Sequence, residues 1–302
     1  MLKNKKFKVI SISLLILVIL LSISVFFYFS FFNNKKEVAI ISCCYGNFEA
    51  TTKTIAEQSV PCDKIFFTDC ASIDNKGDWI IDTTPYHINN NKYLNTDFNN
   101  SWKNNKTNYM ISKYYKAQFL EIPRLKDYKY IFVIDGSIEI TNRDCIKMLI
   151  EKTKKENSNM VCWMHEGRGG ELYGESLASS KDNRWNSTKI KDQDQPFQDV
   201  LGQYNSYIND GYTTEYWKSK NVNENYGVFC TGVNFYKINN ETKKFLDQWY
   251  EEILKWTTQC QISYPYVLQK NSNYKFSVLP DELIKGTCHE KSNIHVRQNH
   301  GK

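Results

Sequence analysis

Five apolar residues, Tyr130–Ile134, are followed directly by a carboxylate at Asp135. The run is rich in β-branched and aromatic side chains, which is typical of a strand that is buried on both faces. A Gly-Ser turn comes next, and Ile138–Ile140 then alternates like a second short strand. α/β enzymes bind ligands at the carboxyl ends of such central strands. Because an unpaired Asp is costly to bury, we expect Asp135 to meet a metal ion or a ligand's hydroxyl groups there, although an Asp before Gly also commonly caps a turn.

Further apolar runs predict a sheet of several strands. Val38–Cys43, Lys64–Thr68 and Trp79–Ile81 are expected strands, and a helix over Ala50–Gln58 would make a βαβ opening with parallel pairing. The other expected strands are Met160–Met164 and Tyr226–Lys237, and the other expected helices are Thr107–Ile122, Arg143–Glu156, Gln195–Asn209 and Glu241–Trp256. Asn89–Lys106 and Glu166–Lys191 are expected loops, the second of the kind that forms active-site lids. The expected fold class is a Rossmann-like α/β fold with a mixed, mainly parallel sheet flanked by helices.

A long uncharged segment precedes this domain. Val9–Phe32 spans 24 residues without a charge, which is enough to cross a hydrocarbon core of roughly 30 Å as a helix. A cleaved signal peptide is the competing interpretation, but its apolar core would be shorter. Four Lys precede the segment, whereas two Lys and one Glu follow it, so the N-terminus is expected in the cytoplasm. We therefore expect a cytoplasmic tail (1–8), one transmembrane anchor (9–32), a short stalk (33–37) and a lumenal catalytic domain (38–302).

The charge of the chain is concentrated in the N-terminal segment. Of the formal net charge of +6, residues 1–37 supply six Lys and one Glu, so the remaining 265 residues carry 33 basic and 32 acidic side chains. Nucleic-acid binding requires a basic surface. The near-neutral balance of residues 38–302 therefore argues against a nucleic-acid partner.

Cysteines and glycosylation sequons agree with a lumenal domain. Nine cysteines suit an oxidising compartment, the odd count leaves at least one thiol outside intramolecular pairs, and no C-x-x-C pair indicates zinc or a thioredoxin-like site. Sequons occur at Asn99, Asn105, Asn186 and Asn240. In a chain this rich in Asn several are expected by chance.

Missing motifs and polar residues after apolar runs narrow the chemistry. The chain has no G-x-S-x-G, H-E-x-x-H, G-x-x-x-x-G-K-[ST] or G-x-G-x-x-G motif. The carboxyl ends of parallel strands meet at one sheet edge, so one cleft could collect the polar residues that follow the strands. Taken singly, each of these polar residues is better explained by a structural role than by a functional one. They are Tyr45, Gly46, Asp69, Asp135, His165, Arg168, Thr231 and Gly232.

Together with further motifs, these residues resemble the TOD/MUCI-type glycosyltransferase-like family, which has a GT-A-like fold and consists mostly of type II Golgi membrane proteins. The resemblance covers roughly residues 38–270. The matching pieces, in chain order, are Tyr45-Gly46-Asn47-Phe48, Phe67-Thr68-Asp69, Trp79-Ile80, Ser112 with Lys116, Ile134-Asp135-Gly136-Ser137-Ile138, His165-x-x-Arg168 with Tyr173 and Glu175, Gln203 with Tyr207 and Gly211, Thr231-Gly232-Val233, Trp249 with Glu252, and Gln261-x-Ser263-Tyr264-x-Tyr266.

The resemblance implies roles for individual residues. Binding of a UDP- or GDP-sugar is implied for Tyr45, Gly46, Asp69, Lys116, Asp135, Ser137, Thr231 and Gly232. Catalytic roles are implied for Asp135, His165, Arg168 and Glu252. A divalent ion, Mn²⁺ or Mg²⁺, is implied at Asp135 and Ser137 with a C-terminal His, for which His289, His295 and His300 are candidates and His300 is taken into the predicted site.

Two departures from the family pattern bear on the mechanism. Ser137 stands where Asp-x-Asp enzymes have their second acid, although the family itself tends to have Ser there. Cys260 stands where the family has an acid before Gln-x-Ser-aromatic. The role of that acid is therefore either unfilled in this chain or performed by Glu252 or Asp281. No carboxylate pair for double displacement is recognisable, which leaves retention and inversion both open.

The sequence therefore predicts a membrane-anchored, nucleotide-sugar-dependent glycosyltransferase that is metal dependent and acts on a glycan or glycoprotein. Its compartment would be the Golgi or endoplasmic reticulum lumen, or an equivalent viral or host membrane. A non-catalytic, membrane-tethered carbohydrate-binding protein with a degenerate GT-A fold is the alternative, and a metal hydrolase using Asp135 and His165 is a third reading.

Overall fold

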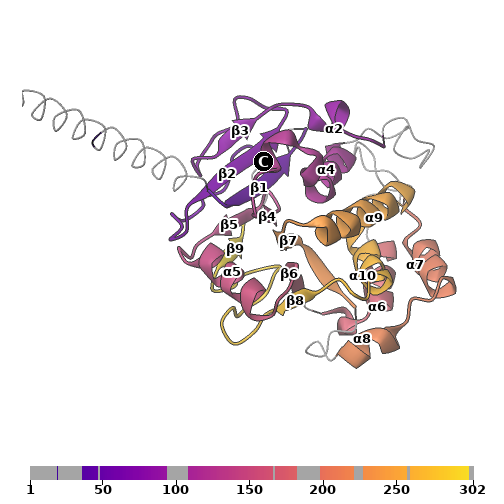
Figure 1. Cartoon of the computed structure of the whole chain (residues 1–302). Helices are drawn as coiled ribbons and strands as arrows, with labels where there is room; N and C mark the ends of the chain where they lie inside the picture. The colour runs from indigo at the N-terminus through magenta and orange to yellow at the C-terminus, as the bar shows by residue number, and fades with distance from the viewer. Residues whose placement is uncertain are drawn as a thin grey trace, which may run out of the picture. The chain divides into compact units, whose positions relative to one another are not determined.

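The computed structural model describes residues 36–46, 48–93, 108–165, 167–181, 198–220, 227–256 and 259–298, together with residue 19 (Figure 1). The chain divides into a unit of residues 1–36 and a unit of residues 37–302. The predicted tail, nearly all of the predicted anchor, and His300 lie outside the described residues. Within the described residues, no helix is both long and apolar enough to span a bilayer.

Seven strands of the described residues form one sheet in the order β3-β2-β1-β4-β7-β6-β8. Their bounds are β1 Val38–Cys44, β2 Cys62–Thr68, β3 Ile80–Asp82, β4 Tyr130–Ile134, β6 Met160–Met164, β7 Phe229–Lys237 and β8 Phe276–Leu279. Strand β7 runs antiparallel to both neighbours, and all other neighbours pair in parallel. The prediction of a mixed, mainly parallel sheet is thus confirmed. Strands β5 (Ile138–Ile140) and β9 (His295–Arg297) form a separate antiparallel pair.

Strand β4 is at the centre of the sheet and is buried on both faces, as its composition predicts. All five of its residues are buried. Ile131 and Val133 belong to one hydrophobic core, and Tyr130, Phe132 and Ile134 belong to a second. Successive side chains of a strand point to opposite faces, so the two cores lie on opposite sides of the sheet.

Helices cover both faces of the sheet (Figure 1). The first core includes residues of α4 (Asn108–Ala117), α7 (Val200–Asn209), α8 (Thr214–Lys220), α9 (Asn240–Trp256) and α10 (Cys260–Lys270). The second core includes residues of α5 (Cys145–Lys155). The remaining helices are α2 (Tyr86–Asn89), α6 (Leu172–Lys181) and the 3₁₀ turns η1 (Phe119–Glu121), η2 (Pro123–Leu125) and η3 (Arg168–Gly170). The helix predicted over Thr107–Ile122 is shorter, because α4 ends at Ala117 and Phe119–Glu121 forms the separate 3₁₀ turn η1. Pro123 disfavours helical backbone at Ile122, which is extended.

The helix predicted over Ala50–Gln58 is wrong. This segment is extended, with Thr51 bridging to Asp74 and Ile55 bridging to Ile140. Four of its nine residues are β-branched, which favours extended backbone. Its backbone groups are paired with two other segments instead of with each other, so β1 and β2 are parallel neighbours without an intervening helix.

The loop predicted over Glu166–Lys191 is wrong over part of its length. Residues 172–181 form α6, whose buried face is Leu172, Glu175, Ser176 and Ser179. These positions recur at helical spacing, but two are serines and one is a glutamate, so the apolar pattern that predicts a helix is absent. Residues 182–191 lie outside the described part of the chain.

Candidate active site

A cavity of about 630 Å³ opens at the carboxyl end of β4, within the size range of small-molecule sites. Strand β6 runs in the same direction as β4, and the antiparallel β7 begins at this edge, so residues that follow β4 and β6 meet the start of β7. Six predicted site residues line it: Lys116, Asp135, His165, Arg168, Thr231 and Gly232. The other lining residues are Tyr109, Lys113, Glu175, Cys230, Gln259, Cys260, Gln261, Thr287, His289, Glu290 and Arg297.

The carboxylate of Asp135 is held between two cations. Lys116 Nζ lies 2.6 Å from Oδ1, and Arg297 Nη2 lies 3.5 Å from Oδ2. The Asp135 backbone N–H donates to the carbonyl of Gly232 at 2.8 Å, which fixes the residue against β7. Burial raises the pKa of Asp135, but the charges of Lys116 and Arg297 outweigh burial and hold this pKa far below the ordinary aspartate value. Asp135 is therefore ionised at neutral pH.

Helix α4 directs three side chains into the cavity. Tyr109, Lys113 and Lys116 are four and three residues apart, which places them on one face of the helix. Lys116 is 8 % exposed. Burial lowers its pKa, but the Asp135 carboxylate more than compensates and raises this pKa above the ordinary lysine value. Lys113 makes no hydrogen bond or ion pair with the residues that the structure describes.

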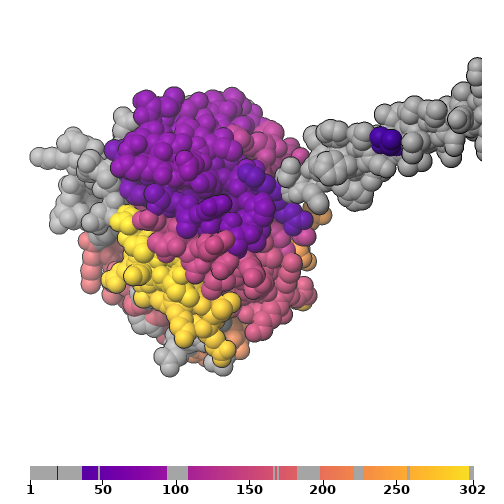
Figure 2. Space-filling view, turned by 90° about the vertical axis from the view of Figure 1, so that its left-hand side faces the viewer, coloured from indigo at the N-terminus to yellow at the C-terminus, as the bar shows by residue number. Residues whose placement is uncertain are grey.

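Arg297 reaches the site from the far end of the chain. Pairing of β9 with β5 sets Arg297 opposite Ile138, next to Ser137. Arg297 Nη1 donates to Ser137 Oγ at 3.2 Å, and the backbone N–H of Gln298 donates to the Ser137 carbonyl at 2.8 Å. Figure 2 shows the C-terminal segment (yellow) at the surface, bordered by N-terminal residues (indigo to purple) and central residues (magenta).

A disulfide between Cys230 and Cys288 ties the same C-terminal segment to β7. Cys230 lines the cavity, and the neighbours of Cys288 in the chain, Thr287 and His289, line it as well. The other seven cysteines are free thiols. The disulfide therefore fixes one wall of the cavity.

Gly232 is needed where β7 passes Asp135. A Cβ at this position would lie 2.6 Å from Asp135 Oδ2 and 2.5 Å from Arg297 Nη2. The pairing of β6 with β7 also skips here, from Cys162 opposite Asn234 to the next residue opposite Cys230. A glycine inside a strand commonly marks a bulge or a close backbone approach, and both occur at Gly232.

A second group of charges surrounds Glu175, on α6. Glu175 is 5 % exposed, and its carboxylate accepts hydrogen bonds from Arg168 Nε and Gln259 Nε2, both at 3.2 Å. His165 Nε2 lies 3.9 Å from the same carboxylate, and the His165 ring lies 4.3 Å from that of His289. The expected cluster of His165 with Arg168 is thus assembled around a buried acid.

The predicted nucleotide-binding residues after β1 and β2 lie at the same sheet edge but do not line the cavity. The Gly46 backbone N–H donates to both carboxylate oxygens of Asp69 at 3.1 Å. Gly46 has φ +74°, and a Cβ there would overlap the amide of Asn108. The Tyr45 ring stacks on Tyr115 at 5.2 Å. These contacts hold the β1 turn against β2 and α4.

Four other candidate residues are placed away from the cavity or beyond the described residues. Glu252 accepts a hydrogen bond of 2.7 Å from the Tyr207 hydroxyl, and Asp281 pairs with a buried lysine on α5. His295 is fully buried. His300 is beyond the described residues. Neither Glu252 nor Asp281 stands in for the acid that Cys260 replaces.

The side chains around Asp135 do not fit a divalent ion. The described residues contain no group of three or more His, Cys, Asp and Glu side chains that could hold one. Both carboxylate oxygens of Asp135 face cations, and the Ser137 hydroxyl is fully buried and accepts from Arg297. His300, the third predicted ligand, lies beyond the described residues, so Asp135 and Ser137 by themselves do not make the predicted metal site.

Sequence reasoning missed several residues of the cavity. Lys113 carries a signal, since it is three residues before Lys116 on a predicted helix. Glu175 belongs to the matched motifs, but no role was assigned to it. Arg297 carries no local signal, because it comes 162 residues after Asp135 and reaches it only through the β5–β9 pairing.

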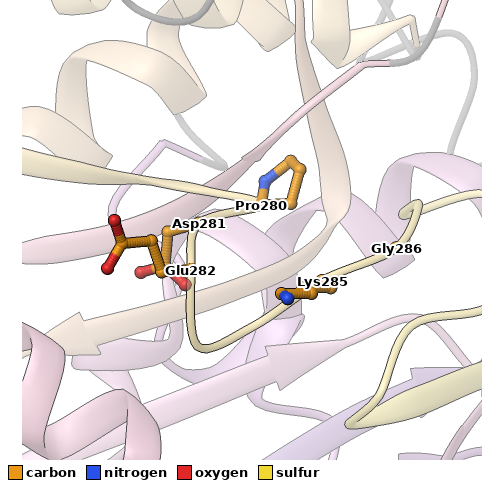
Figure 3. A pocket seen from close by; sticks show the side chains of 5 residues that line it. All are labelled: Pro280, Asp281, Glu282, Lys285 and Gly286. Atoms are coloured by element: carbon orange, nitrogen blue, oxygen red, sulfur yellow. The ribbon is translucent and has the colours of Figure 1, made fainter.

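A second hollow lies over the loop after β8 and has a volume of about 560 Å³. It is lined by Pro280, Asp281, Glu282, Lys285 and Gly286 (Figure 3). Asp281 Oδ1 accepts the backbone N–H groups of Leu283 and Ile284, so this carboxylate serves the loop's own turn. The Asp281 carboxylate is therefore not free to bind a ligand in this hollow.

Residues 183–301 match a family profile described as nucleotide-diphospho-sugar transferase. The match covers less than half of the chain, but it includes β7, α10 and the C-terminal segment with Arg297. No curated protein sequence matches the chain.

Solved glycosyltransferase structures are similar to the chain at low identity. They include core-mannan synthase A from Aspergillus fumigatus in its Mn/GDP form, with 12% identity over 81% of this chain and 71% of that chain and a TM-score of 0.38. The mannosyltransferase Ktr4p from S. cerevisiae matches with 12% identity over 77% and 66%, at a TM-score of 0.35. Mouse xyloside xylosyltransferase 1 in its apo form matches with 8% identity over 80% and 84%, at a TM-score of 0.44. All three scores are below 0.5, so these likenesses say nothing about the substrate of this chain.

Proposed function

We propose that this chain transfers a sugar from a nucleotide-sugar donor to a glycan or glycoprotein acceptor. The observation that carries the proposal is the cavity at the carboxyl end of β4, which is lined by four cationic side chains, Lys113, Lys116, Arg168 and Arg297, and by three carboxylates, Asp135, Glu175 and Glu290. An excess of cations at this sheet edge complements a diphosphate. The family profile matched by residues 183–301 supports the same substrate class.

The reaction assigns different tasks to the charged residues around Asp135 and to those around Glu175. An acceptor hydroxyl oxygen bonds to the anomeric carbon of the donor, the bond from that carbon to the diphosphate oxygen breaks, and the electron pair leaves with the diphosphate. The hydroxyl proton goes to a base, for which His165 beside the buried Glu175 is the best-placed group. Asp135, ionised and immobilised by Lys116, would accept hydrogen bonds from donor hydroxyls. The nucleoside would lie toward the β1 turn at Tyr45 and Gly46, because β1 is the neighbour of β4.

We also propose that residues 9–32 anchor the protein and that the domain faces an oxidising lumen. The excess of Lys before this segment supports this orientation. The Cys230–Cys288 disulfide supports an oxidising compartment.

The test uses the purified full chain in detergent. We expect UDP or GDP to raise its melting temperature and the matching nucleotide-sugar to release nucleoside diphosphate when a glycoprotein acceptor is added. Asp135→Asn should abolish turnover and keep a cooperative melting transition. Asp74→Asn, which removes an exposed carboxylate paired with Lys76, is the matched control and should be fully active. Full activity of Asp135→Asn would refute the role of this carboxylate.

A second candidate, the non-catalytic, membrane-tethered carbohydrate-binding protein, is favoured by Cys260. This thiol occupies the cavity where the resembling family has an acid, and its Sγ is 3.5 Å from Thr231 Oγ1. The same assay separates the two functions. Binding of a glycan without any donor hydrolysis or transfer, across a panel of donors and acceptors, would favour the carbohydrate-binding protein.

A further inference from the structure

We propose that Lys113, Lys116 and Arg297 neutralise the diphosphate of the donor in place of a divalent ion. This inference rests on the proposed function and adds to it the device that manages the negative charge. The three residues are called the cation cluster below.

The charges of the cluster exceed what the fold needs at this point. Three cationic side chains act on one carboxylate, Asp135, so the group has a net charge of +2. A cluster built only to pair Asp135 would be satisfied by Lys116, whose Nζ already lies 2.6 Å from it. The surplus faces the cavity, since all three cations line it. Arg168, Glu175 and Glu290 also line the cavity, and with them the lining still has a net charge of +1, which favours an anionic diphosphate.

The hydrogen-bonding capacity of the cluster also exceeds its use within the described residues. Arg297 Nη1 donates a hydrogen bond to Ser137, and Arg297 Nη2 donates one to Asp135. Its Nε is buried and has no hydrogen-bond partner among the described residues. Lys113 likewise has no ion pair in the described part of the chain. Phosphate oxygens are strong acceptors for both groups.

A divalent ion at the same carboxylate would meet repulsion instead. The ion would have to bind the Asp135 oxygens that now face Lys116 and Arg297, 2.6 and 3.5 Å away. Ser137 cannot compensate, because its hydroxyl is buried and held by Arg297. Fixed cations perform the task that a metal otherwise performs, which is to stabilise the charge that develops on the departing diphosphate oxygen.

The first test measures binding of UDP, GDP and inorganic pyrophosphate to the full chain by calorimetry, in EDTA and in Mn²⁺. We expect the best nucleoside diphosphate to bind in EDTA with an affinity that Mn²⁺ changes by less than about threefold, because the cluster already supplies the positive charge. Binding that disappears in EDTA and returns with Mn²⁺ would overturn the cation cluster and leave the proposed function standing. Absence of nucleoside diphosphate binding under both conditions would reject the proposed function itself.

The second test removes one charge at a time. Lys113→Gln and Arg297→Gln should each weaken nucleoside diphosphate binding in EDTA by about tenfold, the loss of one charge-assisted contact. Arg297→Lys should recover part of the loss, because it restores charge without the planar fork. Lys154→Gln, an exposed lysine of α5, is the matched control and should bind normally. Lys113 is only partly buried and unpaired within the described residues, so its variant should fold even if Arg297→Gln does not. Unchanged binding by a folded Lys113→Gln would exclude this lysine from the cluster.

Discussion

At the scale of single residues, the site depends on Asp135 being charged and closely confined. Lys116 and Arg297 hold its oxygens from two sides, and the backbone of Gly232 closes a third. Such confinement leaves the carboxylate one geometry. A substitution whose side chain overlaps the Asp135 carboxylate should therefore weaken ligand binding as well as stability.

Gly232→Ala should remove nucleoside diphosphate binding and destabilise the fold by about 1–3 kcal/mol, because the new methyl group overlaps Asp135 and Arg297. Gly136→Ala is the matched control: its Cβ would be 3.4 Å from its nearest neighbour, on Glu49. Calorimetric binding and urea unfolding of both variants measure the two effects. Normal binding by Gly232→Ala would show that Asp135 tolerates displacement.

A residue of the site could be predicted from the sequence when the pattern that marks it lies within a few residues along the chain. Asp135 directly follows an apolar run, and Gly232 interrupts one, so each is visible within a few residues. Arg297 was not predictable, since its position depends on strand pairing across most of the domain. Glu175 was not predictable either, because its neighbours on α6 do not repeat apolar residues at helical spacing. It is buried against Arg168 and Gln259, which lie outside α6.

At the scale of elements, strong apolar patterns predicted the fold and weak ones did not. Strands β1, β4 and β6 and helix α9 follow from their buried faces. Ala50–Gln58 was misassigned because its backbone partners are distant segments. Helix α10 contains Pro265, which sequence rules place outside helices, and its packing against α9 and β7 overrides that preference.

The ion pair between Asp82, at the end of β3, and Arg124, in η2, should show a defined pH dependence. Arg124 Nη1 lies 2.6 Å from the buried Asp82 carboxylate. Burial raises the pKa of Asp82, but hydrogen bonds from Arg124 and Thr84 outweigh it, so the pKa is lowered overall. The pair then stabilises the fold above the unfolded-state pKa near 3.9, and this stabilisation is lost as the pH falls below about 4.

Asp82→Asn should therefore lower the free energy of unfolding by about 1–3 kcal/mol at pH 7. The gap between wild type and variant should be constant from neutral pH down to mildly acidic pH and should narrow at lower pH. Urea denaturation over this range measures it. A gap that stays the same at the acid end would contradict the lowered pKa.

The disulfide should support the cavity wall that bears Thr287 and His289. Cys288→Ser should cost about 2–4 kcal/mol of stability and weaken nucleotide binding, because the C-terminal segment is no longer tied to β7. A reducing agent should lower the melting temperature of the wild type and leave that of Cys288→Ser unchanged. Cys70→Ser, at a free cysteine, is the control. Non-reducing peptide mapping that finds Cys230 unlinked would contradict the pairing.

At the scale of the whole molecule, the sheet separates two hydrophobic cores, and the site lies where the strands of both halves end. The proposed anchor and topology belong to this scale too, and they rest on the uncharged segment 9–32 and the charge pattern of residues 1–37.

In sealed microsomes we expect the full chain to resist carbonate extraction, because residues 9–32 are proposed as an anchor. We expect its domain to be protected from added protease, because the Lys excess before residue 9 predicts a cytoplasmic N-terminus. Asn240, which is exposed at the start of α9, should then be glycosylated, and Asn240→Gln should remove one glycan by gel mobility. Replacing Lys3, Lys5, Lys6 and Lys8 with Gln should weaken this orientation. A protease-sensitive domain in intact vesicles would reverse the predicted topology.

The pairing of β5 with β9 has a consequence for how the protein is made. The ribosome completes β4 and Asp135 long before it reaches Arg297, and β9 is not part of the seven-stranded sheet. A nascent chain could therefore assemble its sheet while Asp135 still lacks one of its two cationic neighbours. A premature stop just before Arg297 should therefore yield a chain that forms its seven-stranded sheet and binds nucleoside diphosphate more weakly than the full chain.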